Sequence, residues 1–233
     1  MKKNHKIVVT GGSGRFAKSF KNLKTNYKFF FPSKRELDIT KTSSIKNYIK
    51  LKKPFAVLHL AGLSRPMNIH EKKIGESIKL NIIGTANVVH VCEELKIKVI
   101  YMSTSYVYEG LKGNYKETDP ILPWNNYAWS KLGGECAVQM YKNSLILRAC
   151  VTEKPFVHNK AFSNVKLNFI FHDELVKIIV KLFNKKGIYN VGGKTQTVYD
   201  FAKKYNPNIK KIKSVGQMPL NPSISLSKIN KIK

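Results

Sequence analysis

Thr104, Tyr127 and Lys131 are the residues of this sequence best suited to chemistry. The stretch Tyr127-Ala-Trp-Ser-Lys131 is typical of a helix start, and residues four apart on a helix project from one face. A phenol titrates near ~10, and a neighbouring ammonium favours its ionised form, so we expect Lys131 to bring the pKa of Tyr127 towards neutrality. Tyr127 could then donate or accept a proton at physiological pH, while Thr104 hydrogen-bonds the same substrate oxygen.

The elements around this pair decide its meaning, because many unrelated helices carry a tyrosine and a lysine at the same spacing. Residues 97–102 predict a buried strand that runs into the hydroxyl-rich stretch Ser103-Thr-Ser-Tyr-Val-Tyr108. Residues 55–62 predict another buried strand, within which we expect His59 to be a hydrogen-bonded core histidine rather than a catalyst.

A glycine-rich turn near the N-terminus is the predicted phosphate site. Residues 6–10 predict a strand, and Gly11-Gly-Ser-Gly14-Arg-Phe-Ala17 follows before a helix that ends near Leu23. Glycines permit a tight turn and close backbone approach, and a helix start presents free N–H groups to a phosphate. The turn therefore predicts a dinucleotide site, with an ordinary strand-to-helix turn as the alternative.

The residues after the second predicted strand, 27–31, bear on cofactor preference. NAD-preferring sites often place an acid there, whereas this chain has Ser33-Lys34-Arg35, with Arg15 beside the glycine turn. Positive charge suits a 2′-phosphate, so NADP(H) is the favoured cofactor and NAD(H) the alternative. The competing interpretation is that Lys34 and Arg35 are ordinary surface cations.

The order of elements predicts the fold class. Helices are expected over 43–51 and 74–95, and a fifth strand over 145–149. Strands that alternate with helices predict an α/β fold with a Rossmann-type, doubly wound parallel sheet, whose ligands bind at the carboxyl ends of the strands. The glycine turn, Gly62 and Thr104 all fall at that edge.

The net charge of +28 over 233 residues raises the question of nucleic-acid binding. Lysine supplies nearly all of this charge and is scattered over every predicted helix and loop, which indicates a compositional bias. Base readout depends largely on bidentate arginine, so nucleic acid is not the expected partner. A positive field would still concentrate phosphate-bearing ligands. The arginines are Arg15, Arg35, Arg65 and Arg148.

The cysteines and the hydropathy pattern favour a cytoplasmic protein. Cys92, Cys136 and Cys150 lie in apolar segments, and their odd number suits reduced thiols. None has the spacing of metal ligands, so no metal site is predicted. No window approaches the ~20 apolar residues of a membrane span, and we recognise no signal peptide, so no membrane association is expected.

Several motifs together resemble the extended short-chain dehydrogenase/reductase family. The resemblance covers essentially the whole chain and is particularly to dTDP-4-dehydrorhamnose reductases, whose adenine-contacting and catalytic stretches are similar to Leu37–Thr40 and Ser103–Tyr108. The shared motifs are Gly11-x-x-Gly14, Leu60-Ala61-Gly62, Asn81-x-x-Gly84-Thr85-x-Asn87-Val88, Tyr127-x-x-x-Lys131, Asn168–Asp173 and Gly187–Gly193.

Positions 105 and 106 separate the members of this family. The family's dehydratases carry an Asp-Glu pair where this chain has Ser105-Tyr106, and the epimerase-reductases that make GDP-fucose carry a cysteine at position 106. Neither acid–base apparatus is present, and Tyr106 matches the simple reductases. Ser105 departs from the aspartate that is usual in the reductases.

The resemblance implies a role for each matching residue. Thr104, Tyr127 and Lys131 would be catalytic, and Ser105 and Tyr106 would contact the substrate. The cofactor would be bound by Gly11, Ser13, Gly14, Arg15, Phe16, Lys34, Arg35, Asp38, Ile39, Leu60, Ala61, Gly62, Met102, Tyr127 and Lys131.

The implied activity is that of an NAD(P)H-dependent reductase of a keto-sugar nucleotide, in which hydride reaches a ketone and Tyr127 supplies the proton. Two alternatives stay open: an NAD-dependent nucleotide-sugar epimerase or dehydratase, and a non-catalytic dinucleotide-binding regulatory subunit. The second is motivated by a trimmed C-terminal part, since only about twenty residues separate Arg148 from Asn168.

The expected organisation has two interleaved parts. Residues 1–150 form the NAD(P)-binding Rossmann domain, and residues 151–233 form a small C-terminal substrate-binding lobe. The segment 151–165 is expected to be irregular and polar. Relatives pair into dimers through the helices that begin here at 74 and 127, so a homodimer is expected.

Overall fold

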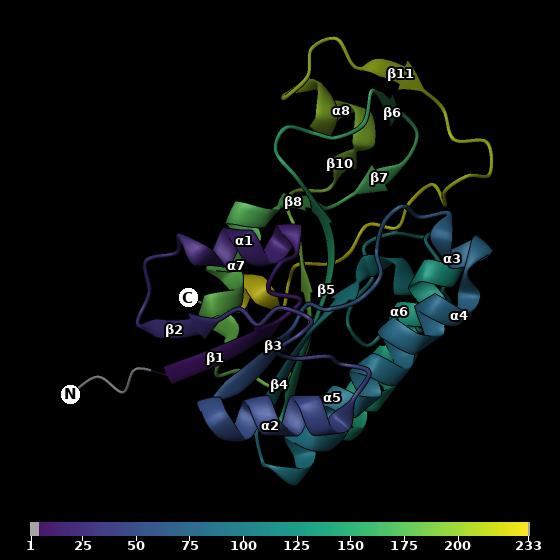
Figure 1. Cartoon of the computed structure of the whole chain (residues 1–233). Coiled ribbons are helices and arrows are strands. Elements are labelled where there is room, and N and C mark those ends of the chain that lie inside the picture. Colours follow the sequence, from purple (N-terminus) through teal and green to yellow (C-terminus); the bar gives the residue numbers. More distant parts are fainter. Residues whose placement is uncertain (1–4, 233) are drawn as a thin grey trace.

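A parallel sheet forms the centre of the molecule in the computed structural model, which describes residues 5–232 (Figure 1). The strand order is β2-β1-β3-β4-β5-β8, and β9 pairs with β5 as well. The chain reverses direction across the sheet between β1 and β3, which makes it doubly wound. The strands are β1 (His5–Thr10), β2 (Tyr27–Phe30), β3 (Ala56–His59), β4 (Lys98–Thr104), β5 (Ser144–Thr152), β8 (Phe169–Phe171) and β9 (Gly187–Val191).

Helices cover both faces of this sheet (Figure 1). Successive strand residues point to opposite faces, so Ile7 and Val9 pack on the side of α1 and α7 while Val8 packs on the side of α2, α5 and α6. The predicted Rossmann-type architecture is therefore confirmed. The helices are α1 (Arg15–Lys21), α2 (Thr42–Lys52), α5 (Gly84–Glu94), α6 (Asn126–Met140) and α7 (His172–Leu182).

The long helix predicted over 74–95 contains a π-helical segment. Its parts are α4 (Ile74–Ser77), η1 (Ile78–Ile83) and α5, and the short α3 (Ile69–Lys72) precedes them. A π segment widens the helix by one residue per turn and is frequent at functional sites. Here it carries Asn81, whose side chain is buried and turned towards the loop after β3.

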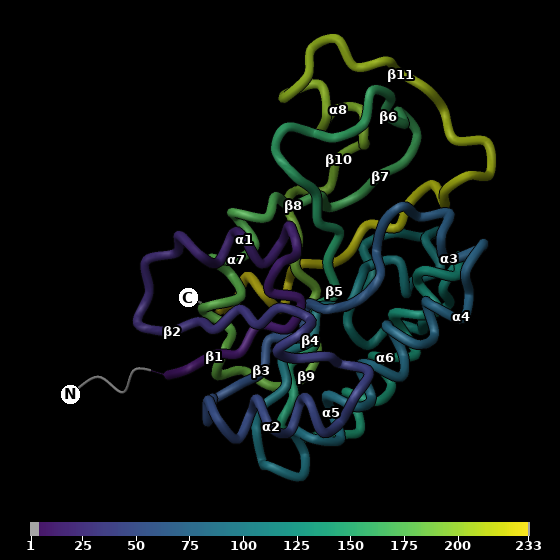
Figure 2. The backbone as a smooth tube through the Cα atoms, in the orientation of Figure 1, coloured from purple at the N-terminus to yellow at the C-terminus, as the bar shows by residue number. Residues whose placement is uncertain are grey.

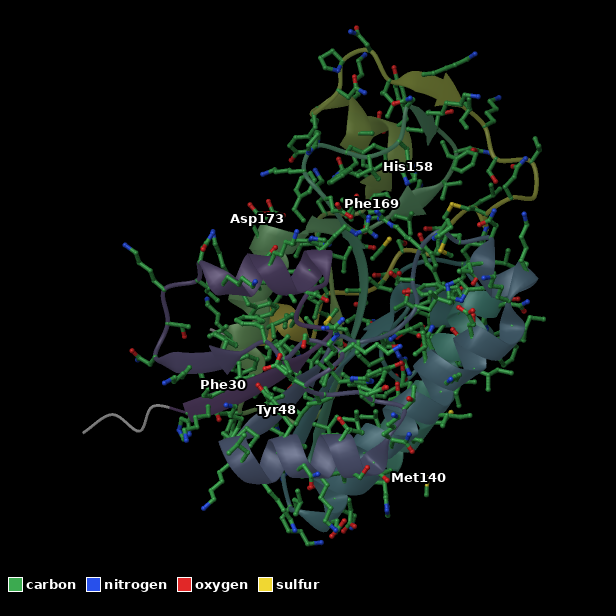
Figure 3. The ribbon with its side chains drawn as sticks, viewed as in Figure 1. Phe30, Tyr48, Met140, His158, Phe169 and Asp173 are labelled. Atoms are coloured by element: carbon green, nitrogen blue, oxygen red, sulfur yellow. The ribbon has the colours of Figure 1, made fainter. Side chains whose placement is uncertain are left out.

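Part of the chain beyond residue 151 builds a small lobe above the carboxyl ends of the strands (Figures 1 and 3). Its aromatic core includes Phe156, Phe171 and Phe201. The segment 151–165 was expected to be irregular and polar, and this is only partly right. Residues 153–159 and 163–165 lie outside helices and strands, but Phe156 and Val165 are buried, and β6 within the segment pairs with β11, which lies far along the sequence. The elements of the lobe are β6 (Lys160–Phe162), β7 (Lys166–Leu167), β10 (Gln196–Thr197), α8 (Val198–Lys203) and β11 (Lys210–Ile212).

The last segment of the chain returns from the small lobe to the main body (Figure 2). The amide of Ser225 donates to the carbonyl of Tyr115 over 2.8 Å, and the amide of Ile224 donates to Oδ1 of Asn168 over 2.8 Å. The final turn, η3 (Ile229–Lys231), packs against the main core. Because β8 and β9 pair with β5 and α7 packs on one face of the main sheet, the part after residue 150 is interleaved with the part before it.

Candidate active site

The glycine turn and the ends of β3 and β4 meet at one edge of the sheet, since β1, β3 and β4 are parallel neighbours. Gly11 has a φ of +68°, and a Cβ there would lie 2.9 Å from the backbone of Ala61. The turn is closed by the amide of Gly14, which donates to the carbonyl of Gly11 over 2.8 Å. Only glycine permits this conformation together with this approach of two backbones.

His59, at the end of β3, is hydrogen-bonded to Thr10 at the end of β1 and to Thr85 in α5. The Thr85 hydroxyl donates to the carbonyl of Asn81 over 2.8 Å, so it accepts from Nε2 of His59 over 3.0 Å. Nδ1 therefore accepts from the Thr10 hydroxyl over 2.7 Å. Burial lowers the pKa of His59 to about 3, and the charge of Lys131 adds to this. The prediction of a satisfied core histidine is confirmed.

Asn81 connects the loop after β3 to the helix that carries Tyr127. Its side-chain amide accepts from the amide of Leu63 over 2.7 Å and donates to the hydroxyl of Ser130 over 2.8 Å. The Ser130 hydroxyl in turn donates to the carbonyl of Tyr127 over 2.8 Å. A continuous hydrogen-bonded path therefore fixes Tyr127 relative to the edge of the sheet.

Tyr127 is half-buried in the first turn of α6, which Asn125 caps by accepting from the amide of Ala128 over 2.8 Å. Its ring lies 5.0 Å from that of His70 and 6.4 Å from that of Tyr106. Burial raises the pKa of Tyr127 to about 12, whereas a hydrogen bond to Thr104 and the charge of Arg65 oppose the rise.

The expectation that Lys131 lowers the pKa of Tyr127 is therefore wrong for this structure. Lys131 is buried, and its Nζ lies 4.2 Å from the centre of the Tyr101 ring. Burial lowers the pKa of Lys131 to about 7, with the charge of Glu135 opposing the fall. Desolvation outweighs charge attraction at both groups, and an ordinary phenol–ammonium pair in water does not predict that.

A buried ion pair lies below Lys131. Nη2 of Arg148 contacts Oε1 of Glu135 at 2.6 Å, and the hydroxyl of Ser103 donates to Oε2 over 2.5 Å. Arg148 also donates to the hydroxyl of Tyr108 over 2.8 Å. Because both charges are paired and hydrogen-bonded, this network can hold β4, β5 and α6 together without an uncompensated buried charge.

The two predicted substrate contacts lie in the single turn η2 (Ser105–Val107) that follows β4. Ser105 is fully buried, and its hydroxyl has no partner among the described residues. The ring of Tyr106 lies 5.1 Å from that of Trp124, and its hydroxyl accepts from the thiol of Cys150 over 3.6 Å. Tyr106 and Tyr127 thus face each other across the end of β4.

The predicted cofactor residues differ in how far they are exposed. Ser13, Gly14, Arg15, Lys34 and Arg35 are exposed, whereas Ile39 and Met102 are buried in the core.

The remaining predicted cofactor residues line the turns themselves. Phe16 packs 5.0 Å from His172, and the amides of Leu60 and Ala61 each donate to the Thr10 hydroxyl over 3.1 Å. The carboxylate of Asp38 accepts from the amide and the hydroxyl of Thr40, which lowers its pKa. A Cβ on Gly62 would lie 2.7 Å from Oδ1 of Asn81, so a side chain at position 62 would disturb the Asn81 hydrogen bonds.

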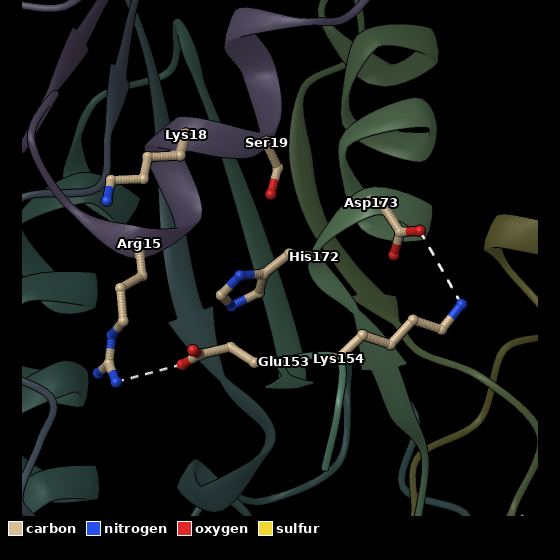
Figure 4. A pocket seen from close by; sticks show the side chains of 7 residues that line it. All are labelled: Arg15, Lys18, Ser19, Glu153, Lys154, His172 and Asp173. Atoms are coloured by element: carbon tan, nitrogen blue, oxygen red, sulfur yellow. Dashed lines mark ion pairs between the residues drawn. The ribbon is translucent and has the colours of Figure 1, made fainter. Parts of the chain in front are cut away.

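The sequence patterns did not identify Glu153 and Arg65 as residues of this edge. A surface pocket beside α1 and α7 includes Arg15, Lys18, Glu153 and His172 in its lining (Figure 4). Glu153 also pairs with Arg65, whose Nη1 lies 3.0 Å from Oε1 of the carboxylate. The two residues are 88 positions apart, and no local pattern in the sequence indicates that they meet.

Two further properties concern metals and membranes. Within residues 5–232, no three His, Cys, Asp or Glu side chains are grouped so that they could hold a metal ion. Over the same range, no helix has both the length and the apolar character that a membrane crossing requires.

A doubly wound sheet with a glycine turn, a threonine and a tyrosine at its carboxyl edge defines the class of Rossmann-type dehydrogenases and reductases. Comparison with protein families narrows this class to one family. Residues 5–179 match the RmlD substrate binding domain, and the chain belongs to that family.

Individual relatives agree with this assignment. The chain is 27% identical over 159 residues to a dTDP-4-dehydrorhamnose reductase of Aggregatibacter actinomycetemcomitans, in a match that covers 66% of this chain and 54% of the relative. It is 28% identical over 158 residues to methionine adenosyltransferase 2 subunit beta of Xenopus laevis, which covers 64% of this chain and 47% of the relative. The chain therefore spans about half the length of the curated relatives it matches.

Solved structures show the same fold. A dTDP-4-dehydrorhamnose reductase of Bacillus anthracis, solved in complex with NADP, superposes with a TM-score of 0.89 at 20% identity and covers 100% of this chain and 94% of its own. An enzyme of Bordetella bronchiseptica, solved in complex with NAD, gives a TM-score of 0.78 at 17% identity over 99% of this chain and 88% of its own. At these identities the likeness establishes the fold.

Proposed function

We propose that the chain is an NAD(P)H-dependent reductase of a keto-sugar nucleotide, of the dTDP-4-dehydrorhamnose reductase type. The observation that carries this proposal is the placement of Thr104 and Tyr127 together at the edge where the glycine turn lies. The relatives named above support the substrate class, and the solved relative with NADP supports the cofactor.

The glycine turn fits a dinucleotide. Gly11 leaves no side chain between the turn and Ala61. Arg15 directly follows the turn, Lys34 and Arg35 lie in the loop after β2, and all three are exposed cations. We assign these cations to the phosphates of NADP(H), with NAD(H) as the alternative, and Lys131 to the nicotinamide ribose. When bound, the dinucleotide supplies the hydride.

The raised pKa of Tyr127 suits the reductive direction. With a pKa of about 12, Tyr127 keeps its proton at neutral pH and can give it to the alkoxide that forms from a ketone. Thr104 lies beside it and is placed to donate a hydrogen bond to the same oxygen. An epimerase or dehydratase cycle begins with an oxidation that needs the phenolate, which burial disfavours, so the reductase is the better reading of this site.

The activity is tested by mixing the protein with NADPH and a panel of nucleotide sugars that carry a ketone, and following absorbance at the wavelength of the reduced nicotinamide. We expect net NADPH oxidation, and a loss of roughly 10²–10⁴-fold in Tyr127→Phe with cofactor binding retained. Isomerisation or loss of water without net oxidation would instead assign the epimerase or dehydratase.

A second candidate is a non-catalytic dinucleotide-binding subunit. The match to methionine adenosyltransferase 2 subunit beta favours it, because that relative is by its name a subunit. Tight NADPH binding with no turnover across the sugar panel would support this candidate over the reductase.

We also propose that the chain forms a homodimer through α6 and the π segment beside it. Ile83, Trp129 and Met140 are large apolar side chains that are 48%, 50% and 87% exposed on these helices (Figure 3 labels Met140). Light scattering after gel filtration should give a dimer, and Ile83→Lys should shift it to a monomer.

The three free cysteines support a cytoplasmic location.

A further inference from the structure

Two arginines from different loops converge on one carboxylate oxygen at the edge of the sheet. Nη1 of Arg15 lies 3.2 Å and Nη1 of Arg65 lies 3.0 Å from the same Oε1 of Glu153. Arg15 follows the glycine turn after β1, Arg65 follows β3, and Glu153 follows β5. Figure 4 shows the Arg15–Glu153 contact from close by. The three residues therefore connect the loops that follow β1, β3 and β5 at the carboxyl edge of the sheet.

The charge of this cluster is not balanced by the carboxylate. Two guanidiniums share the carboxylate of Glu153. The pocket that Arg15 and Glu153 line also holds Lys18, Lys154 and Asp173, and Asp173 pairs with Lys154 at 4.0 Å, so Lys18 adds a further positive charge. Each guanidinium has five N–H donors in a planar fork, which matches the geometry of phosphate oxygens. Since the contacts to Glu153 use one nitrogen of each arginine, further donors are free to bind a second anion.

The surroundings of Arg65 place it inside the site. Its positive charge opposes the rise that burial causes in the pKa of the Tyr127 phenol and of the Cys150 thiol, and it adds to the fall that burial causes in the pKa of His158 in the small lobe. These groups come from α6, from β5 and from the lobe, so Arg65 lies where the three meet. Its side chain is 32% exposed, so an anion that approaches this edge of the sheet can reach it.

We propose that Arg65 and Arg15 form a two-arginine phosphate clasp, and that Glu153 is an internal anion which orients both guanidiniums and competes with the ligand for them. The ligand group is the diphosphate of the dinucleotide. The identity of that ligand rests on the proposed function, whereas the clasp itself is a property of these three residues. Arg65 thereby becomes a binding residue that no sequence motif assigns.

The test measures binding of NADPH by fluorescence, and of inorganic pyrophosphate by competition and calorimetry, to the full chain. Arg65→Gln should raise the Kd of both ligands by roughly ten- to a hundredfold, because a charge-assisted hydrogen bond is lost. Glu153→Gln should lower both Kd values several-fold, because the amide still accepts a hydrogen bond but no longer repels the diphosphate. Misfolding cannot explain a gain in affinity.

Lys96→Gln is the matched control. Lys96 is part of an exposed ion pair with Glu93 at 2.7 Å, and it precedes β4 at the opposite edge of the sheet. The Lys96→Gln substitution removes one positive charge and one ion pair, as Arg65→Gln does, but far from the clasp, so its Kd values should equal those of the wild type.

The outcomes separate the clasp from the proposed function. If Arg65→Gln binds both ligands as Lys96→Gln does, or if Glu153→Gln weakens them, the clasp is overturned while the reductase assignment stands. Failure of the wild type to bind pyrophosphate also overturns the clasp. If the wild type binds pyrophosphate through Arg65 but does not bind NADPH, the clasp stands and the proposed cofactor is wrong.

Discussion

Replacement of Lys131 by methionine should stabilise the folded protein at neutral pH while it removes a residue assigned to the active site. Lys131 is buried, and its pKa falls from 10.5 to about 7 in the folded chain. Each pKa unit corresponds to about 1.36 kcal/mol. Burying this group at pH 7 therefore costs on the order of 4 kcal/mol, which an apolar side chain of similar length does not incur.

The sign of the pH dependence follows from proton counts. Between about pH 7 and pH 10.5 the unfolded chain holds a proton on Lys131 that the folded chain does not, so the stability of the wild type rises with pH over this window. In Lys131→Met this rise is lost. The stability difference between the two proteins should be largest at or below pH 7 and should shrink by pH 10.

Urea unfolding followed by circular dichroism at pH 6, 7, 8, 9 and 10 measures both effects on the cofactor-free chain. The exposed Lys142 provides a matched variant, Lys142→Met, whose pH profile should follow that of the wild type. The reasoning is refuted if Lys131→Met is less stable than the wild type at pH 7, or if its pH profile keeps the slope of the wild type.

Three further perturbations test the packing that positions the site. His59→Gln should reduce the loss of stability at acid pH. Because the pKa of His59 is about 3 in the folded chain, the wild type loses stability as the pH falls below 6.5, on the order of 3 kcal/mol by pH 4. An equal loss in both proteins would contradict this. Gly134→Ala should lower the free energy of unfolding by about 1–3 kcal/mol, since its Cβ would meet the carbonyl of Asn81, the Tyr101 hydroxyl and Thr85. Gly75→Ala, whose Cβ would meet nothing within 4 Å, should stabilise slightly, and equal effects of the two variants in urea unfolding would contradict this. Arg148→Met should cost about 3–5 kcal/mol and Arg148→Met with Glu135→Leu much less, because only the single variant leaves a buried charge unpaired.

The sheet was predictable because the local sequence pattern identifies its strands. Residues 6–10, 27–31 and 97–102 are short apolar or β-branched runs, and the structure places β1, β2 and β4 there. The end of β3 was not predictable: it stops at His59 rather than at Gly62 because the amides of Leu60 and Ala61 donate to the Thr10 side chain instead of a neighbouring strand.

The candidate site was only partly predictable for a related reason. Spacing on a helix predicts that Tyr127 and Lys131 share a face, but the sign of each pKa shift depends on burial, which arises from distant elements. The Arg65–Glu153 contact and the β6–β11 pairing likewise join segments far apart in sequence. Such contacts exist only once the sheet and the lobe have assembled.

The measurement that tests the central claim most directly is the transfer of deuterium from NADPH deuterated at both C4 positions to a keto-sugar nucleotide, read by mass spectrometry of the sugar product. A reductase with Tyr127 as proton donor predicts one deuterium per product molecule and one oxidised cofactor per deuterium. A sugar product that carries no deuterium, or an unchanged rate of transfer in Tyr127→Phe, would contradict the account.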